Sequence, residues 1–155
     1  MSTKGYSRAI IAAGIMGVLV STYALYVEMA AEARPGYKAM CDFSEYASCS
    51  RVLTSEYSKG FGIIPKESAL EVPNCIYGIM FYCLMIFLGT YDHVGVARLQ
   101  LLLAFASCLS SVYLAYLLAF VLHDFCIVCV STYFINAMLF SFVYKKNKFL
   151  TVKNK

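Results

Sequence analysis

The chain has 155 residues, of which 61% are hydrophobic and 14% are charged, and its formal net charge is +4. Its mean hydropathy is +0.68. Soluble domains are roughly half apolar and a quarter charged, so a soluble core of this size could not bury so much apolar surface. The composition excludes an ordinary soluble domain and predicts a membrane protein with a single domain over residues 1–155.

Four apolar segments are candidates for crossing a bilayer. A crossing takes about 20 apolar helical residues, because the hydrocarbon core is about 30 Å thick. His123 and Asp124 interrupt the longest apolar stretch, and because two ionisable residues are costly in lipid, they indicate a tight hairpin. We predict an all-α membrane protein, a four-transmembrane-helix bundle with a long lumenal loop over residues 30–74. Its spans are residues 9–29, 75–91, 98–122 and 125–144.

The first apolar segment has an alternative interpretation as a cleaved signal peptide. Lys4 and Arg8 would form the charged region of such a peptide, and small residues follow the segment. The apolar run is longer than the roughly 7–15 residues that are typical of a signal peptide, which favours a membrane span.

Basic residues are distributed unevenly along the chain. The two tails contain seven lysines and arginines and no acidic residue, whereas residues 28–71 contain five basic and seven acidic residues. Cytoplasmic segments of membrane proteins are enriched in lysine and arginine, so both termini are predicted to be cytoplasmic. The long loop and the His123–Asp124 hairpin then share the opposite, lumenal face.

The seven cysteines fall into two groups. Cys41 and Cys49 lie in the long loop, and Cys126 and Cys129 form a C-x-x-C pair at the start of the fourth segment. All four are therefore predicted at the lumenal face, where disulfides form and persist. The other three are interpreted as small buried apolar residues: Cys75, Cys83 and Cys108.

The position of the C-x-x-C pair favours thiol chemistry. With Asp124 as the N-cap of the fourth helix, Cys126 lies in the first turn, where the helix dipole favours a thiolate. Cys129 lies on the same face one turn deeper, and Tyr133 continues that face. The pattern indicates electron transfer from soluble thiols at the membrane surface to a lipid-soluble acceptor.

Structural explanations exist for several of these residues. Cys41 and Cys49 can form an inert disulfide. The four cysteines together could bind zinc, but a separation of eight positions in the loop does not match the usual ligand spacing, and we expect no metal. Tyr133 can be an interfacial or packing residue, and Asn74, just before the second segment, suits an N-cap.

Four motifs occur in the order and spacing found in the vitamin K epoxide reductases, and the chain resembles that family from the first segment through the fourth. The motifs are CDFSEYASCSR, KGFG, PNCIYG and FCIVCVSTY. The resemblance implies a membrane thiol oxidoreductase that reduces vitamin K 2,3-epoxide to the quinone and the quinone to the hydroquinone. Vitamin K is then the substrate, and no tightly bound cofactor is expected.

The resemblance also implies a role for each cysteine of the two pairs. Cys129 attacks the substrate, and Cys126 resolves the adduct by closing the Cys126–Cys129 disulfide. Cys49 reduces that disulfide through a mixed disulfide with Cys126, and Cys41 accepts electrons from a lumenal donor. Each transfer between cysteines is an attack of a thiolate on a disulfide.

Five substrate-binding residues are implied in the same way: Asn74, Tyr133, Leu53, Ser55 and Phe61. The first two match the family's hydrogen-bonding residues for the substrate oxygens, and the others close the pocket or dip back into the membrane. The chain has no tryptophan, so Tyr57 stands where the family usually has one, and Leu53 replaces an aromatic residue. These departures affect the shape of the pocket and the affinity of inhibitors more than the redox path.

The implied location is the endoplasmic reticulum membrane. The implied partners are a lumenal thioredoxin-like or protein disulfide isomerase-type electron donor, membrane lipid and warfarin-type inhibitors, and we expect no nucleic acid. Two alternatives stay open: a quinone-linked enzyme that forms disulfides in lumenal proteins, and a non-catalytic claudin-like four-span protein. The claudin-like alternative predicts tryptophan in the first loop and gives Cys126 and Cys129 no role.

Overall fold

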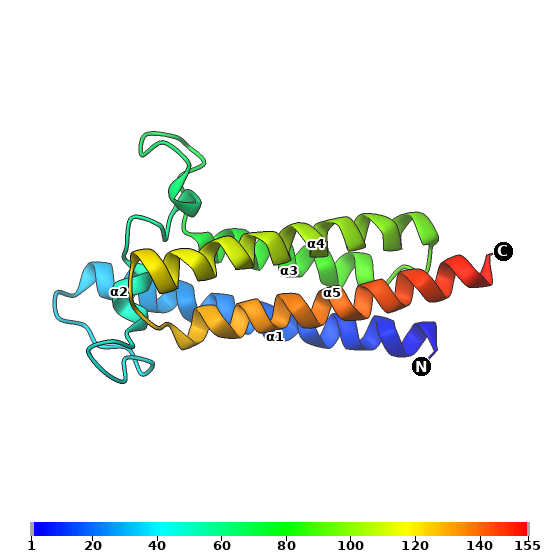
Figure 1. The fold of residues 1–155 in the computed structure, drawn as a ribbon, viewed down its shortest axis with the longest axis horizontal. Coiled ribbons are helices and arrows are strands. Elements are labelled where there is room, and N and C mark those ends of the chain that lie inside the picture. The colour runs from blue at the N-terminus through cyan, green and yellow to red at the C-terminus, as the bar shows by residue number, and fades with distance from the viewer. Residues whose placement is uncertain (1, 155) are drawn as a thin grey trace.

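The computed structural model describes residues 2–154, and helices make up most of it (Figure 1). Its long helices are α1 (Thr3–Ala33), α3 (Asn74–Gly89), α4 (Val94–Tyr116) and α5 (Ile127–Lys153). The connection between α1 and α3 contains the short elements α2 (Cys49–Leu53) and η1 (Gly60–Gly62), and α4 continues into a π-helical turn, η2 (Leu117–Val121). Residues 2–154 contain no strand, which confirms the all-α prediction.

Within the described residues, three helical segments are long and apolar enough to cross a membrane: Thr3–Ala33, Val94–Val121 and Ile127–Lys153. The fourth, α3, is apolar but has only 16 residues. At 1.5 Å per residue it is about 24 Å long, which is shorter than a hydrocarbon core of about 30 Å. Four complete spans therefore stay a prediction.

The first helix is longer than the sequence analysis predicts. α1 continues to Ala33, so residues 30–33, which were expected in the loop, are helical. Between η2 and α5 the chain leaves the helix over residues 122–126, and His123 has a φ of 50° in the left-handed region. The break lies at the His123–Asp124 pair, where the sequence predicts a turn.

Small residues bring α1 and α3 close together. A Cβ atom on Gly17 would lie 2.5 Å from the ring of Tyr82, and one on Gly14 would lie 2.6 Å from the Ile86 side chain. Helices in lipid associate through close backbone packing of this kind, because an apolar side chain gains little free energy by moving from lipid to a neighbouring helix. α1 also packs against α5, and α5 packs against α4.

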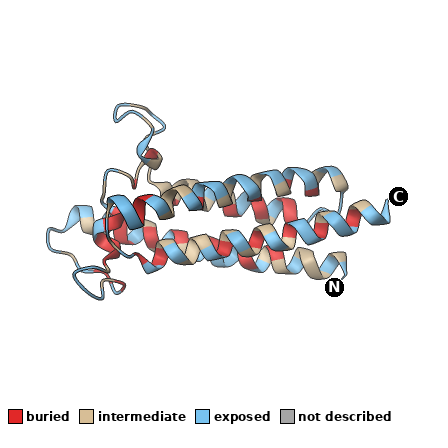
Figure 2. Cartoon of the chain, in the orientation of Figure 1, coloured by how far each residue is buried: buried red, intermediate tan, exposed pale blue. Residues whose placement is uncertain are grey.

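Two buried clusters fill the bundle. The cluster near the long loop includes Val27 and Cys126, and the second includes Met85 and Leu139. Buried residues lie mainly between the helices, whereas many outward faces are exposed (Figure 2). In Figure 1, α2 and the long loop lie at one end of the bundle, and the start of α1 and the end of α5 lie at the other.

Candidate functional site

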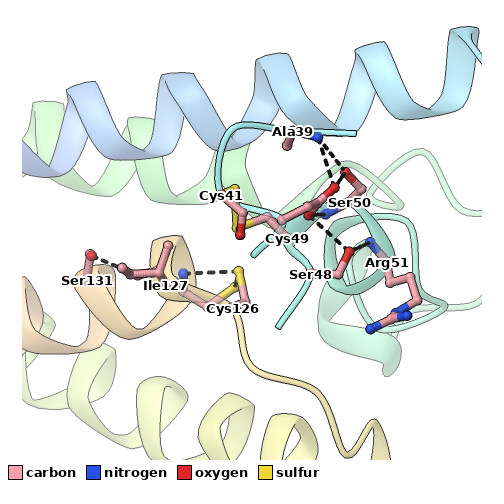
Figure 3. The surroundings of a disulfide bond; sticks show 11 residues. Ala39, Cys41, Ser48, Cys49, Ser50, Arg51, Cys126, Ile127 and Ser131 are labelled. Carbon is pink, nitrogen blue, oxygen red and sulfur yellow. Dashed lines mark hydrogen bonds between the residues drawn. A yellow bond between two sulfur atoms is a disulfide. The ribbon is translucent and has the colours of Figure 1, made fainter. Parts of the chain in front are cut away.

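The long loop places a disulfide beside the start of α5. Cys41 and Cys49 are bonded to each other, and both belong to the same buried cluster as Cys126. Figure 3 shows the disulfide with Cys126 among the residues around it. Because the bond uses both loop sulfurs, the four-cysteine zinc alternative is not formed in this structure.

Asp42 organises the chain around this disulfide. Its carboxylate accepts hydrogen bonds from the Ala39 amide at 2.9 Å, the Ser48 hydroxyl at 3.0 Å, and the amide and hydroxyl of Ser50 at 3.0 and 2.6 Å. Burial alone would raise the pKa of Asp42, but these hydrogen bonds outweigh it and hold the pKa below its usual range. The carboxylate thereby fixes the start of α2, where Cys49 is the first helical residue.

The loop is also tied to the hairpin that precedes α5. Arg51 donates to both carboxylate oxygens of Asp124, at 2.7 and 3.0 Å, and to the carbonyl of Glu45. The Phe125 amide donates to the Tyr46 carbonyl at 2.9 Å. The hydrogen bond to Asp124 raises the pKa of Arg51. Asp124 is therefore an ion-pair partner of the loop, and the prediction that it caps α5 is wrong.

The C-x-x-C pair begins α5. Cys126 is the N-cap rather than a residue of the first turn, and its Sγ accepts a hydrogen bond from the Cys129 amide at 3.4 Å. The two Sγ atoms lie 2.8 Å apart and are not bonded. A disulfide measures about 2.05 Å between its sulfurs, so closing one needs only a small movement. Cys126 is fully buried, whereas Cys129 lines a cavity.

The cavity beside Cys129 has a volume of about 360 Å³. α1, α3, α4, α5 and the loop all contribute to its wall, which is largely apolar with a few polar groups. All five predicted substrate-binding residues line it: Asn74, Tyr133, Leu53, Ser55 and Phe61. Tyr57 lines it as well. A largely apolar cavity with a few converging polar groups is typical of sites for small apolar ligands.

Asn74 shapes the cover of this cavity. Pro73 is the N-cap of α3, so the alternative in which Asn74 caps the helix is wrong. The Asn74 side chain instead accepts a hydrogen bond from the Phe61 amide at 2.8 Å and donates to the Tyr57 carbonyl at 2.7 Å. Phe61 has a φ of 57°, which is unusual for an aromatic residue, and Asn74 holds it there. Among residues 2–154, the second N–H of the Asn74 amide has no hydrogen-bond partner.

The sequence analysis missed a polar chain across the cavity wall. The Tyr82 hydroxyl donates to Oδ1 of Asn136 at 2.8 Å, and Nδ2 of Asn136 donates to the Ser111 hydroxyl at 2.8 Å. All three residues line the cavity, and they belong to α3, α5 and α4. An amide side chain inside an apolar segment is costly in lipid unless it is hydrogen-bonded. The presence of Asn136 in the fourth apolar segment therefore indicates a polar contact between helices.

Comparison with known proteins identifies the family of this chain. A sequence model of the Vitamin K epoxide reductase family matches residues 8–144. The chain is 42% identical over 134 residues to vitamin K epoxide reductase complex subunit 1 of Rattus norvegicus, covering 83% of each chain. The protein of the same name from Mus musculus gives the same identity and coverage.

Proposed function

Because this chain belongs to the vitamin K epoxide reductase family, we propose that it is a membrane thiol oxidoreductase acting on vitamin K. It reduces vitamin K 2,3-epoxide to the quinone and the quinone to the hydroquinone. The observation that carries this function is the placement of the C-x-x-C pair. Cys129 lines the apolar cavity. The Sγ atom of Cys126 lies 2.8 Å from that of Cys129, and Cys126 is buried in the same cluster as the loop disulfide. The non-catalytic claudin-like alternative does not explain a C-x-x-C pair beside a cavity.

The two thiols supply what the reaction consumes. The Cys129 thiolate attacks an epoxide carbon, the carbon–oxygen bond breaks, and the oxygen takes a proton. The Cys126 thiolate then attacks Sγ of Cys129, which forms the Cys126–Cys129 disulfide and returns an electron pair to the ligand. The oxygen leaves as water. Two electrons and two protons pass from the dithiol to the substrate, so one substrate is reduced for each disulfide formed.

Polar groups of the cavity orient the substrate for this attack. The free N–H of Asn74 and the Tyr133 hydroxyl are the groups that hydrogen-bond the substrate oxygens. Donors in an apolar, water-poor site stabilise charge that develops on an oxygen. Leu53, Ser55 and Phe61 enclose the ring system, since all three line the same cavity.

The loop pair recharges the site. Cys49 attacks Cys126 to form a mixed disulfide, and Cys41 then closes the Cys41–Cys49 disulfide, which a thioredoxin-like or protein disulfide isomerase-type donor reduces. The support is proximity, because the loop disulfide and Cys126 share one buried cluster and Arg51 joins the loop to Asp124.

We place the chain in the endoplasmic reticulum membrane with four spans and both termini cytoplasmic. α2, which begins at Cys49, and the start of α5 lie at the end of the bundle opposite the start of α1 and the end of α5, which agrees with a lumenal site (Figure 1). The cavity is also the place where warfarin-type inhibitors would compete with vitamin K. The chain's own thiols supply the electrons, and no tightly bound cofactor is required.

Dithiol-driven turnover of vitamin K epoxide tests the function. We expect the parent to turn over and Cys129→Ala to lose activity by at least about a hundredfold, because the nucleophile is gone. Cys126→Ala should accumulate a covalent adduct between Cys129 and the substrate, visible as added mass in intact-protein mass spectrometry. Cys83→Ala is the matched control, because Cys83 is exposed and does not line the cavity.

The other results separate the alternatives. If the parent reduces the quinone and not the epoxide, the proposed substrate is limited to vitamin K quinone. Faster oxidation of lumenal protein thiols in the presence of quinone would favour the disulfide-forming enzyme. A folded, reduced parent that turns over neither substrate contradicts the proposed function.

A further inference from the structure

The cavity contains a second thiol that the proposed reaction does not use. Cys75, the residue after Asn74 on α3, lines the cavity with Cys129 and forms no disulfide. Its thiol donates toward Oε2 of Glu28 on α1, with Sγ and Oε2 3.7 Å apart. A thiol that contacts a carboxyl group on one side and borders a ligand cavity on the other can pass a proton between them.

Glu28 lies in a position that suits proton exchange. Its exposed fraction is 1%, and its second oxygen, Oε1, is buried without a hydrogen-bond partner among residues 2–154. Burying a carboxyl group with an unpaired oxygen is costly, so its presence needs a reason other than stability. Buried ionisable groups beside a cavity are characteristic of catalytic sites.

Two ionisable groups near Glu28 reach the surface. Glu32 lies four residues further along α1, on the same helix face. Its carboxylate pairs with Nζ of Lys59 at 3.0 Å, and the side chains of Glu32 and Lys59 are 48% and 36% exposed. The ionisable groups therefore run from the surface pair of Glu32 and Lys59, through buried Glu28, to Cys75 at the cavity.

We propose that Glu28 and Cys75 form a proton relay that delivers a proton from water to Cys129 when the Cys126–Cys129 disulfide is reduced. The proposal rests on the proposed function, in which this disulfide is reduced in every cycle. The relay is needed because Cys129 faces an apolar cavity, where a leaving thiolate has little water from which to take a proton.

The step balances in atoms and electrons. A reductant thiolate attacks Sγ of Cys126, the sulfur–sulfur bond breaks, and its electron pair leaves on Sγ of Cys129. The Cys75 thiol gives its proton to that sulfur and takes one from the Glu28 carboxyl group. Glu28 regains a proton from water at the Glu32 and Lys59 end, so Cys75 is never oxidised.

The test measures release of the Cys129 thiol in the full chain. The chain is oxidised with diamide in detergent and reduced with dithiothreitol, and N-ethylmaleimide with mass spectrometry follows labelling of Cys129. We expect Glu28→Gln and Cys75→Ala each to slow this release about tenfold at about pH 6, where the Glu28 carboxyl group of the parent holds its proton, because proton transfer loses its donor. The double variant should be no slower than either single variant, because both lie on one path. Glu67→Gln, at an exposed loop position, is the matched control.

Two further results distinguish a relay from a structural role. Cys75→Ser keeps a group that passes protons, so its rate should stay within about threefold of the parent. The difference in rate between the parent and Glu28→Gln should shrink as the pH rises, because the Glu28 carboxyl group of the parent then loses the proton that it donates. The ionisable groups that face Glu28 are Glu32 on α1, Lys59 in the loop and Cys75 on α3, and the variant leaves them all in place.

Equal rates in Glu28→Gln and the parent overturn the relay, as does a Cys75→Ser variant as slow as Cys75→Ala. A difference in rate between Glu28→Gln and the parent that is the same at every pH also overturns the relay. The assay contains no vitamin K, so it separates the two proposals. Absence of vitamin K turnover with a working relay contradicts the proposed function alone, and the reverse result contradicts the relay alone.

Discussion

The guanidinium of Arg51 donates two hydrogen bonds to the carboxylate of Asp124, at 2.7 and 3.0 Å, across 73 positions of the sequence. Arg51 follows Cys49 by two residues, and Asp124 precedes Cys126 by two. The ion pair therefore joins the two chain segments that carry the two cysteine pairs. Its position makes it the clamp that holds the loop pair within reach of the C-x-x-C pair.

Asp124→Asn tests this clamp by removing the charge while keeping the size. The Arg51 side chain is 54% exposed, so water screens the pair and its loss costs about 1 kcal/mol. We expect turnover driven by a thioredoxin-like protein donor to fall about fivefold, because Cys49 meets Cys126 less often. Oxidation of the C-x-x-C pair by substrate in a single turnover should keep its rate, since it does not use the loop.

The matched control for the clamp is Lys66→Ala, which removes an exposed ion pair with Glu56 elsewhere in the loop. Its donor-driven turnover should equal that of the parent. Equal donor-driven rates in Asp124→Asn and the parent would show that the loop docks without the ion pair.

Asn74 supports the cavity cover and is proposed to bind the substrate, and two variants separate these roles. Asn74→Ala leaves the Phe61 amide and the Tyr57 carbonyl without their partner, which should lower the free energy of unfolding by about 1–3 kcal/mol. Asn74→Asp keeps an acceptor for Phe61 but removes both N–H donors and sets a carboxylate oxygen against the Tyr57 carbonyl, so it should lose at least as much stability as Asn74→Ala. Both variants should lower kcat/KM for the epoxide, because neither can donate to its oxygen.

Thermal unfolding in detergent and steady-state kinetics with vitamin K epoxide measure these two effects for Asn74. An Asn74→Asp variant with parental kcat/KM would limit Asn74 to holding the cover. In that case Tyr133 would be the remaining predicted donor to the substrate.

The positions of the two cysteine pairs and of the five residues in the cavity wall could be predicted because their pattern is local or matches family motifs. The C-x-x-C spacing places Cys126 and Cys129 one turn apart in any helix. The break at His123–Asp124 follows from the cost of ionisable residues in lipid. These inferences need no knowledge of which helices are neighbours.

The roles of Asp124 and Glu28 depend on packing between segments that are distant in the sequence, which hydropathy does not specify. Asp124 suits an N-cap by residue type, but Arg51 from the loop takes its carboxylate and leaves Cys126 as the cap. Glu28 was counted among loop charges, although α1 continues past it and α3 brings Cys75 against it. In each case a tertiary partner decides the role of a residue whose local pattern suggested another.

The stability of the loop should depend on pH through Asp42. Its pKa in the folded chain lies below the value of about 3.9 for a free aspartate. As the pH falls, the unfolded chain binds the proton first, so the stabilising effect of Asp42 is complete above about pH 5 and declines as the pH falls through the folded pKa. We expect the thermal midpoint of the parent to exceed that of Asp42→Asn by a constant amount from about pH 7 to 5, and by less toward about pH 3.

A difference between Asp42→Asn and the parent that stays constant down to about pH 3 would contradict this account of Asp42. Glu67→Asn is a suitable comparison, because Glu67 is an exposed loop carboxylate. The thermal midpoint of that variant should follow the parent at every pH.

Lys146 should stabilise the end of the bundle that lies away from the cysteines. The sequence analysis counted it among the tail lysines that set topology, but its exposed fraction is 0%. Its Nζ donates to the carbonyls of Gly89 and Tyr91 at 3.1 and 2.8 Å and pairs with Asp92 at 3.2 Å. It therefore joins α5 to the C-terminal end of α3, where the helix dipole favours a cation.

Lys146→Met keeps the length of the side chain but leaves the carbonyls of Gly89 and Tyr91 without this donor and removes the ion-pair partner of Asp92. We expect the free energy of unfolding in detergent to fall by about 2–3 kcal/mol, because unpaired buried polar groups keep their desolvation cost. Turnover of vitamin K epoxide per folded molecule should stay parental, since Lys146 does not line the cavity. Lys145→Met removes an exposed charge from the same turn and should leave both quantities unchanged. If the two variants unfold alike, the contacts of Lys146 contribute no net stability, because the cost of burying its charge equals their attraction.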